Sequence, residues 1–252
     1  ARRAIVFPNS FRSAWVPFLA HVPERVGFPG SGRRFLLTRS VHPVSYTGSR
    51  HQALDYFALV GAAPAAVPPV LDGLLAIPAA VRDALRTRLR AAAAGTPGFP
   101  AEGPWMAVAP GAARGSSKRW PASHFAAAAA AVFRARGCGV IVCGTGAERE
   151  AGDAIAASVP GGTINLAGAT TLPELAALFQ LCRLVLCNDS GAMHLAAAVS
   201  TPVVALFGLT DPGRTGPLGR GHAVLAPDGV RGHAAIGRES AAAAQALAAI
   251  RP

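Results

Sequence analysis

A run of small and polar residues, 188–191, comes directly after an apolar segment and directly before a segment with helical periodicity. In open parallel sheets, ligands bind beyond the carboxyl ends of the strands. The free N–H groups at the start of the following helix bind anions such as a diphosphate, and Gly191 permits close approach of a ligand. His194 lies one helical turn after Ser190, so both side chains face the same side. Asp189 lies between the apolar segment and these two residues. The pattern as a whole predicts an anion-binding site at this turn.

Two other interpretations of this turn are open to test. Asp189 or Ser190 fits a plain helix N-cap, with His194 as a surface residue. A Ser-His-Asp hydrolase fits less well, because the G-x-S-x-G elbow is absent and triad members usually come from separated loops.

A second loop, residues 110–121, follows another apolar segment and contains Lys118, the single lysine among the 24 basic side chains. A compact ammonium on a flexible stem suits a phosphate leaving group, whereas arginine is the default cation of this chain. The order of residues is not that of a P-loop. We expect Lys118 and the adjacent Ser117 to contact phosphate, although a surface loop with solvated charges fits the same residues.

A third loop, residues 144–150, begins with Gly-Thr-Gly but has Arg149 where a dinucleotide fingerprint has its third glycine. Its carboxylates suit ribose hydroxyls, which makes Glu148 or Glu150 a candidate for that contact. Either carboxylate is equally typical of a helix N-terminus without a ligand.

These loops need a scaffold, and the second half of the chain predicts one. Strands that are apolar throughout alternate with helices, which is typical of an α/β, doubly wound parallel sheet covered on both faces. The expected strands are 106–109, 140–143, 163–166, 184–187 and 203–207. The expected helices are 121–136, 148–158, 172–181, 191–199 and 239–250.

The first hundred residues are less regular. They predict one strand at 5–7 and helices at 9–20, 51–60 and 79–94, followed by a linker at 95–98. We therefore expect residues 1–95 to be the remnant of an amino-terminal domain. Residues 96–252 are expected to form a complete carboxyl-terminal nucleotide-binding domain.

Composition narrows the class of protein. Hydrophobic residues make up 51% of the 252 residues and charged ones 15%, which excludes a disordered chain. No apolar run is long enough to span a membrane, so we expect a soluble cytoplasmic protein. The net charge of +11 is spread over dispersed arginines, so we expect no nucleic-acid partner; a nucleic-acid-binding Rossmann-like protein remains a weaker alternative, resting on charge alone.

The four cysteines fit neither a zinc knuckle nor a CxxC redox pair, and no metal site is expected. All four lie in or beside apolar runs, which predicts buried free thiols in a reducing compartment.

Three segments together resemble glycosyltransferase family 9, the bacterial ADP-heptose:lipopolysaccharide heptosyltransferases, and within it the heptosyltransferase II branch. The strongest runs from Asn188 to Ala198 and continues through residues 203–208 and 211–212. The loop from Pro110 to Pro121 is similar to the phosphate-side loop of the family. Residues 8–18 and 25–28 are similar to the middle of the family's chain.

The resemblance implies a GT-B fold, with two Rossmann-like domains that bind the sugar nucleotide and the lipid acceptor. It implies an inverting, metal-independent transfer of L-glycero-D-manno-heptose from ADP-heptose, with no other cofactor. The acceptor implied is the lipid-anchored Kdo/heptose inner core at the inner membrane surface, with peripheral membrane contact. The implied catalytic residues are Lys118 on the leaving diphosphate, and Asp189 and His194 beside the heptose.

The resemblance also assigns binding residues. Ser190 and Gly191 would hold the phosphates, Met193 would lie near the adenine, and Glu148 or Glu150 would take the ribose. Asn9 and Ser10 would line the acceptor side.

One part of the family pattern has no counterpart. Members begin with a strand leading into a Gly-Asp loop whose Asp acts as general base, whereas this sequence resembles the family only from near the last strand of that first domain. Two hypotheses follow: a heptosyltransferase whose amino-terminal part is missing from this sequence, or a catalytically inactive fragment that binds the ADP sugar.

Overall fold

The computed structural model describes residues 1–43, 51–61, 73–112, 118–208 and 210–226. It contains two compact units. The first unit comprises residues 1–69 with 213–215, and the second comprises 70–212 with 216–252. The division therefore lies near residue 70, whereas the sequence predicted it at 95. The physical reason is the helix α3 (Ala79–Ala94), whose Leu85, Leu89 and Ala93 are buried in the core of the second unit.

The second unit is built on a sheet of six parallel strands, in the order β6-β5-β4-β7-β8-β9. Their bounds are β4 Trp105–Ala109, β5 Gly139–Val142, β6 Thr163–Asn165, β7 Leu184–Asn188, β8 Val203–Leu206 and β9 Ala223–Leu225. Every residue of β4, β5, β7 and β8 is buried, as a sheet covered on both faces requires. The predicted doubly wound parallel sheet is thus confirmed. The sequence did not predict β9, whose residues are only partly buried or exposed.

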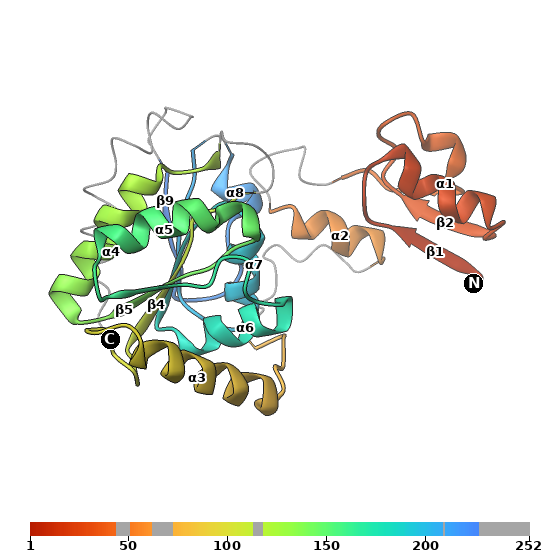
Figure 1. Cartoon of the computed structure of the whole chain (residues 1–252). Coiled ribbons are helices and arrows are strands. Elements are labelled where there is room, and N and C mark those ends of the chain that lie inside the picture. The colour runs from red at the N-terminus through yellow and green to blue at the C-terminus, as the bar shows by residue number, and fades with distance from the viewer. Residues whose placement is uncertain (44–50, 62–72, 113–117, 209, 227–252) are drawn as a thin grey trace. The chain divides into compact units, whose positions relative to one another are not determined.

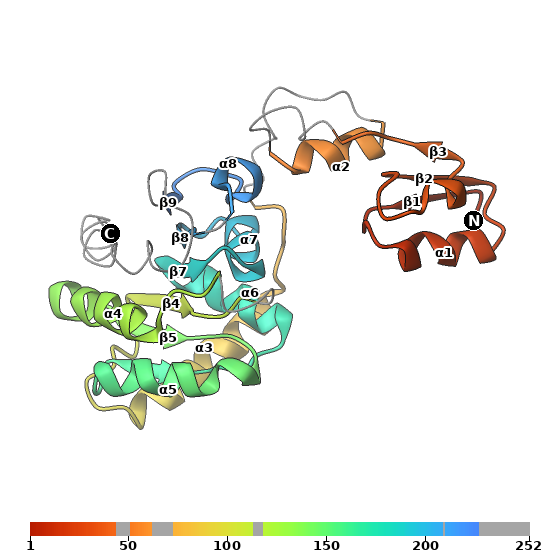
Figure 2. The same cartoon turned by 90° about the horizontal axis from the view of Figure 1, so that it is seen from above.

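Helices cover both faces of this sheet (Figures 1 and 2). On one face lie α3, α6 (Leu172–Leu181) and α7 (Gly191–Ala198), which share a core with Ala107, Ile141 and Val185. On the other lie α4 (Ala122–Arg136) and α5 (Arg149–Ser158), which share a core with the alternate strand residues. Successive residues of a strand point to opposite faces of the sheet, and both faces are buried here, so each strand contributes alternate residues to the two cores.

Alanine dominates the buried face of α4. Four alanines, Ala126, Ala128, Ala129 and Ala130, are buried there beside Phe125. Because an alanine side chain is a single methyl group, the helix backbone approaches the sheet closely. Gly137, the residue after the predicted helix end at 136, ends the helix in the left-handed conformation.

The chain order creates a switch point in the sheet. From β4 the chain runs outward through β5 and β6, then returns to β7 on the other side of β4 and runs outward again to β9. Helices that follow β4 and β7 therefore leave in opposite directions, which opens a crevice at the carboxyl edge between the two strands. The loops after β4 and β7 are two of the three loops that the sequence singled out.

The first unit has three parallel strands, β1 (Arg3–Val6), β2 (Glu24–Gly27) and β3 (Arg39–Ser40), in that order. Its helices are α1 (Phe11–Leu19), the 3-10 helix η1 (Arg34–Leu36) and α2 (Ala53–Leu59). The prediction of a single strand here was wrong. Arg25 explains why β2 is hard to recognise: its guanidinium donates to the carbonyls of Leu36 and Val22, so a charged residue occupies a strand position.

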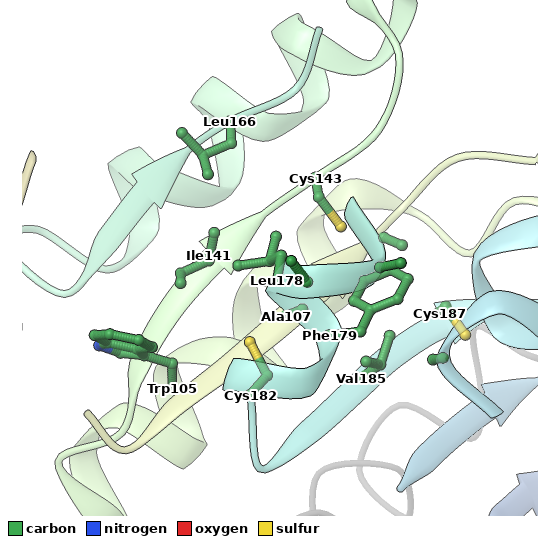
Figure 3. Close-up of a cluster of buried hydrophobic side chains, with 14 of the residues drawn as sticks. Trp105, Ala107, Ile141, Cys143, Leu166, Leu178, Phe179, Cys182, Val185 and Cys187 are labelled. Carbon is green, nitrogen blue, oxygen red and sulfur yellow. The ribbon is translucent and has the colours of Figure 1, made fainter. Parts of the chain in front are cut away.

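The four cysteines are free and buried, as predicted. Figure 3 shows three of them, Cys143, Cys182 and Cys187, among the side chains of one core. Burial raises the pKa of the Cys143 thiol to about 12 and that of Cys138 to about 11. Neutral thiols therefore act as small apolar side chains here.

No helix in the described ranges is long and apolar enough to cross a membrane. The predicted helix 239–250 lies outside the described residues.

Candidate functional site

Two of the predicted site residues meet at the switch point. The Lys118 ammonium donates to Asp189 Oδ2 at 2.5 Å, although the two residues lie 71 positions apart. Thr210 Oγ1 donates to the same oxygen at 2.6 Å. Asp189 is 8% exposed, so this carboxylate is largely withdrawn from water and is neutralised by the lysine. The arrangement holds a cation at the carboxyl edge between β4 and β7.

Asn188, the last residue of β7, joins the same two loops. Its Oδ1 accepts the Trp120 N–H at 3.0 Å, and its Nδ2 donates to the Pro110 carbonyl at 2.8 Å. Asn188 is fully buried, so no water molecule could take its place as the hydrogen-bond partner of these two backbone groups. Trp120 in turn packs edge-on against Phe125, with ring centroids 5.1 Å apart. Asn188 thereby fixes both ends of the loop that carries Lys118.

The start of α7 is left available to a ligand. Ser190 is the N-cap residue, yet its side chain makes no capping hydrogen bond, and its buried Oγ has no partner. A Cβ atom added at Gly191 would meet nothing within 4 Å. The first N–H groups of the helix and the Ser190 hydroxyl therefore offer unused donors, which is the arrangement that binds an anion. The plain capping interpretation of Ser190 and of Asp189 receives no support, because no capping bond to α7 from either is present among the described residues.

A cavity of about 660 Å³ opens beside this helix start. Its walls come from the loops after β4, β5 and β6, from α6 and from the first residues of α7. The lining residues are Ala109, Gly111, Ala112, Arg119, Cys143, Gly144, Thr145, Ala147, Glu148, Gly168, Thr170, Thr171, Leu172, Leu175, Ser190, Gly191 and Ala192. Most are small or apolar, with a few polar groups, which is typical of a pocket for a small organic ligand.

Glu148 is the acidic residue of this pocket. Its Oε2 accepts from the Thr145 N–H at 2.8 Å and from the Thr145 hydroxyl, in a capping box. Its Oε1 lies 3.6 Å from an Arg119 guanidinium nitrogen. Gly111 allows this placement, because a Cβ there would come within 2.8 Å of Glu148 Cδ. Glu150, the alternative candidate, is exposed on α5 and does not line the pocket.

The other predicted residues of this unit lie elsewhere. Met193 is fully buried in the core shared by α6 and α7, so its side chain does not reach the pocket, which speaks against the predicted adenine contact. His194 is exposed on α7 and does not line the pocket. Ser117 lies outside the described residues.

Asn9 and Ser10, predicted for the acceptor side, belong to the first unit. Ser10 caps α1 by accepting the Ser13 N–H at 3.2 Å. Asn9 Oδ1 accepts from Arg33, a fully buried arginine that also donates to the carbonyls of Pro8, Ser10 and Phe28. Burial lowers the pKa of Arg33. Both predicted residues thus sit in a loop fixed by one guanidinium.

Within the described ranges, no group of three or more His, Cys, Asp or Glu side chains is arranged to hold a metal ion. Two further cavities, of about 450 and 640 Å³, lie at the opposite, amino edge of the strands, where Cys182 lines both. None of the predicted site residues lines them.

Sequence reasoning missed two contributors to the site. Thr210 lies 21 residues beyond Asp189, between residues 203–208 and 211–212 of the family resemblance, and only the fold brings its hydroxyl to the carboxylate. Arg119, the residue after Lys118, was not singled out from the sequence, yet it lines the pocket, donates to the Ala112 carbonyl at 3.2 Å and faces Glu148.

Comparisons with known proteins agree with this architecture. The chain is 34% identical over 227 residues to "Lipopolysaccharide heptosyltransferase 2" of Salmonella typhimurium, a match that covers 86% of this chain and 62% of that protein. It is also 34% identical over 224 residues to "Lipooligosaccharide heptosyltransferase 2" of Haemophilus influenzae, covering 85% and 62%. The chain thus spans somewhat less than two thirds of the length of these curated relatives.

A solved structure superposes on nearly the whole chain. It is that of the E. coli ADP-heptose LPS heptosyltransferase II, with a TM-score of 0.78 and 28% identity, covering 98% of this chain and 76% of the other. A glycosyltransferase family 9 structure from Veillonella parvula has the same fold, with a TM-score of 0.72 and 22% identity over 94% of this chain and 70% of the other. The predicted α/β fold of GT-B type is thereby confirmed.

The family model described as "Glycosyltransferase family 9 (heptosyltransferase)" matches residues 1–230, which is most of the sequence. The chain therefore belongs to glycosyltransferase family 9, and the Lys118 ammonium held at the switch point agrees with this assignment.

Proposed function

We propose that the protein transfers L-glycero-D-manno-heptose from ADP-heptose to the lipid-anchored Kdo/heptose inner core of lipopolysaccharide. The observation that carries the proposal is the contact of Lys118 with Asp189, two residues before the open start of α7, which lines a cavity of about 660 Å³. The names of the relatives supply the sugar and the acceptor class. Because this acceptor is lipid-linked, the proposed location is the cytoplasm at the inner membrane surface.

The leaving group determines what the second unit must do. In an inverting transfer, the acceptor oxygen attacks the anomeric carbon on the face opposite ADP. The bond from that carbon to the β-phosphate oxygen breaks, and its electron pair leaves with ADP. Lys118 and the N–H groups at the start of α7 would stabilise the negative charge that develops there. A lysine and a helix N-terminus neutralise this charge without a metal ion, so we propose a metal-independent reaction.

The pocket would take the nucleoside. Its small and apolar lining suits the adenine face, and Glu148 would accept hydrogen bonds from the ribose hydroxyls. Of the two acidic candidates, Glu148 is favoured because it lines the pocket and Glu150 does not. Ser190, whose hydroxyl has no partner, would donate to a phosphate oxygen. Asp189 would orient Lys118, with its carboxylate on the heptose side.

Calorimetric titration of the chain with ADP tests the nucleotide site. We expect saturable binding that weakens about tenfold to hundredfold in Lys118→Ala, because a charge-assisted hydrogen bond is removed. Arg134→Ala is the matched control, since it removes one exposed positive charge at the far end of α4. No binding by a folded sample, or equal weakening in both variants, would overturn the proposal.

A second candidate function is favoured by one observation, the 62% share of the relatives' length that the chain spans. In this case the chain binds the ADP sugar and catalyses no transfer, because the general base is supplied by residues outside this sequence. Incubation with ADP-heptose and a Kdo-containing lipid acceptor separates the two. Glycosylated acceptor supports the enzyme, whereas ADP-heptose binding without product supports the second function.

A further inference from the structure

Two consecutive basic residues extend to opposite sides of the nucleotide site. Lys118 pairs with Asp189, which follows β7. Arg119 faces Glu148, the last residue of the 3-10 helix η4 (Gly146–Glu148), which follows β5. Because β4 lies between β5 and β7 in the sheet, the loop after β4 can reach both neighbouring loops. One short segment of the chain therefore contacts a carboxylate on each flank of the site.

The Arg119 guanidinium connects two walls of the pocket. Its Nη2 donates to the Ala112 carbonyl at 3.2 Å and lies 3.6 Å from Glu148 Oε1. Its Nε lies 3.4 Å from the same carbonyl, and both Ala112 and Glu148 line the cavity. The donors of a planar guanidinium lie at fixed angles. The bonds to the Ala112 carbonyl therefore fix the side from which Arg119 approaches the Glu148 carboxylate.

The two oxygens of the Glu148 carboxylate have different surroundings. Oε2 accepts two hydrogen bonds from Thr145, one from the backbone N–H and one from the hydroxyl. Oε1 is the oxygen that faces Arg119, and a Cβ added at Gly111 would lie 3.0 Å from it. Arg119 therefore acts on the carboxylate oxygen that does not take part in the bonds to Thr145.

We propose that Arg119 is a positioning residue for nucleotide recognition, which holds Glu148 Oε1 in the orientation that accepts hydrogen bonds from the ribose hydroxyls. The inference rests on the proposed function, which places the ribose at Glu148. The Arg119 side chain is 44% exposed, and an ion pair of this exposure contributes little to folding stability. Loss of Arg119 is therefore expected to change which nucleotides bind and to leave the midpoint of urea denaturation unchanged.

Calorimetric titration of the 252-residue chain with ADP and with 2′,3′-dideoxy-ADP tests the inference. Both nucleotides carry the same diphosphate, so the ratio of their affinities cancels the effect of the Arg119 charge on the phosphates and reports recognition of the ribose hydroxyls. We expect the unmodified chain to bind ADP about tenfold to a hundredfold more tightly than the dideoxy nucleotide, which lacks the hydrogen bonds to a charged group. In Arg119→Ala, this ratio is expected to fall to about threefold or less.

Two other variants remove a positive charge at a different place. Lys118→Ala is expected to weaken both nucleotides by the same factor and to keep the ratio of the unmodified chain. Arg134→Ala, at the exposed end of α4, is expected to change neither affinity. An unchanged ratio in Arg119→Ala would overturn the inference, as would an equal fall of the ratio in Lys118→Ala.

A double variant shows whether Arg119 acts through Glu148. Glu148→Gln is expected to lower the ratio by itself, and the addition of Arg119→Ala is expected to lower it no further. A further fall in Arg119→Ala/Glu148→Gln would overturn the positioning role, because the guanidinium would then contact the ribose directly.

The same titrations keep this inference apart from the proposed function. ADP binding with an unchanged ratio in Arg119→Ala overturns the positioning role alone. Equal affinity of the unmodified chain for the two nucleotides removes Glu148 from the ribose site, and the inference with it, while the rest of the nucleotide site stands. Absence of binding by both nucleotides overturns the nucleotide site itself.

Discussion

One oxygen of Asp189 accepts hydrogen bonds from both Lys118 and Thr210, at 2.5 Å and 2.6 Å. The carboxylate therefore orients the Lys118 ammonium and, at the same time, neutralises part of the positive charge that would attract a phosphate. Binding of a diphosphate has to compete with this internal anion. A balance of this kind makes the affinity of the site sensitive to the charge of one side chain.

Asp189→Asn is expected to bind ADP about tenfold more tightly at low salt, because the competing negative charge is removed while the shape is kept. Calorimetric titration measures the change. Asp83→Asn, which removes an exposed carboxylate on α3, is expected to leave the affinity unchanged. Weaker binding in Asp189→Asn would show that orientation of Lys118 outweighs the competition.

Asn188→Ala is expected to lower the free energy of unfolding by about 2 to 4 kcal/mol. The substitution leaves the Trp120 N–H and the Pro110 carbonyl without their buried partner, at roughly 1 to 3 kcal/mol each. Urea denaturation measures the loss, and the exposed amide variant Gln180→Ala is expected to change stability by less than about 0.5 kcal/mol. A similar small effect for Asn188→Ala would contradict the role of this residue in joining the two loops.

Gly111→Ala is expected to displace Glu148, because the new Cβ would lie 2.8 Å from its Cδ. Loss of the capping box costs about 1 kcal/mol of stability. ADP affinity is expected to fall roughly twofold to tenfold with loss of the ribose contact. Gly146→Ala is the control, since its Cβ meets no atom within 4 Å. Unchanged ADP affinity in Gly111→Ala would remove Glu148 from the ribose site.

Stability is expected to fall as the pH rises above about 8.5, the ordinary pKa of a cysteine thiol. Burial raises the pKa of Cys143 to about 12 in the folded chain, so between these values only the unfolded chain gains by releasing the proton. Each fully buried thiol therefore lowers the free energy of unfolding by at most about 1.4 kcal/mol per pH unit in this window. Urea denaturation of the unmodified chain and of Cys143→Ala, at a series of pH values, is expected to show a shallower slope in the variant. Identical slopes would exclude Cys143 as a source of the pH dependence.

The buried sheet of the second unit could be predicted from sequence, because strands such as 140–143 and 184–187 are apolar throughout and lie between helices. The strand β2 could not, because its Glu24 and Arg25 obscure the pattern and Arg25 is satisfied by carbonyls that only the fold provides. The loops of the site were predictable from their place after strands. Contacts across the sheet, such as that of Thr210 with Asp189, depend on the strand order, which no local pattern specifies.

The alanines of α4 restrict which substitutions this chain can tolerate during evolution. A methyl group at each of the four buried positions leaves no room for a longer side chain unless the helix moves away from the sheet. Trp120, just before this helix, is held by Asn188 and packs on Phe125, so such a movement would also shift the segment that carries Lys118. Substitutions on this face of α4 are therefore restricted by the need to keep Lys118 in place, although the four alanines lie on the helix and not in the loop that carries Lys118.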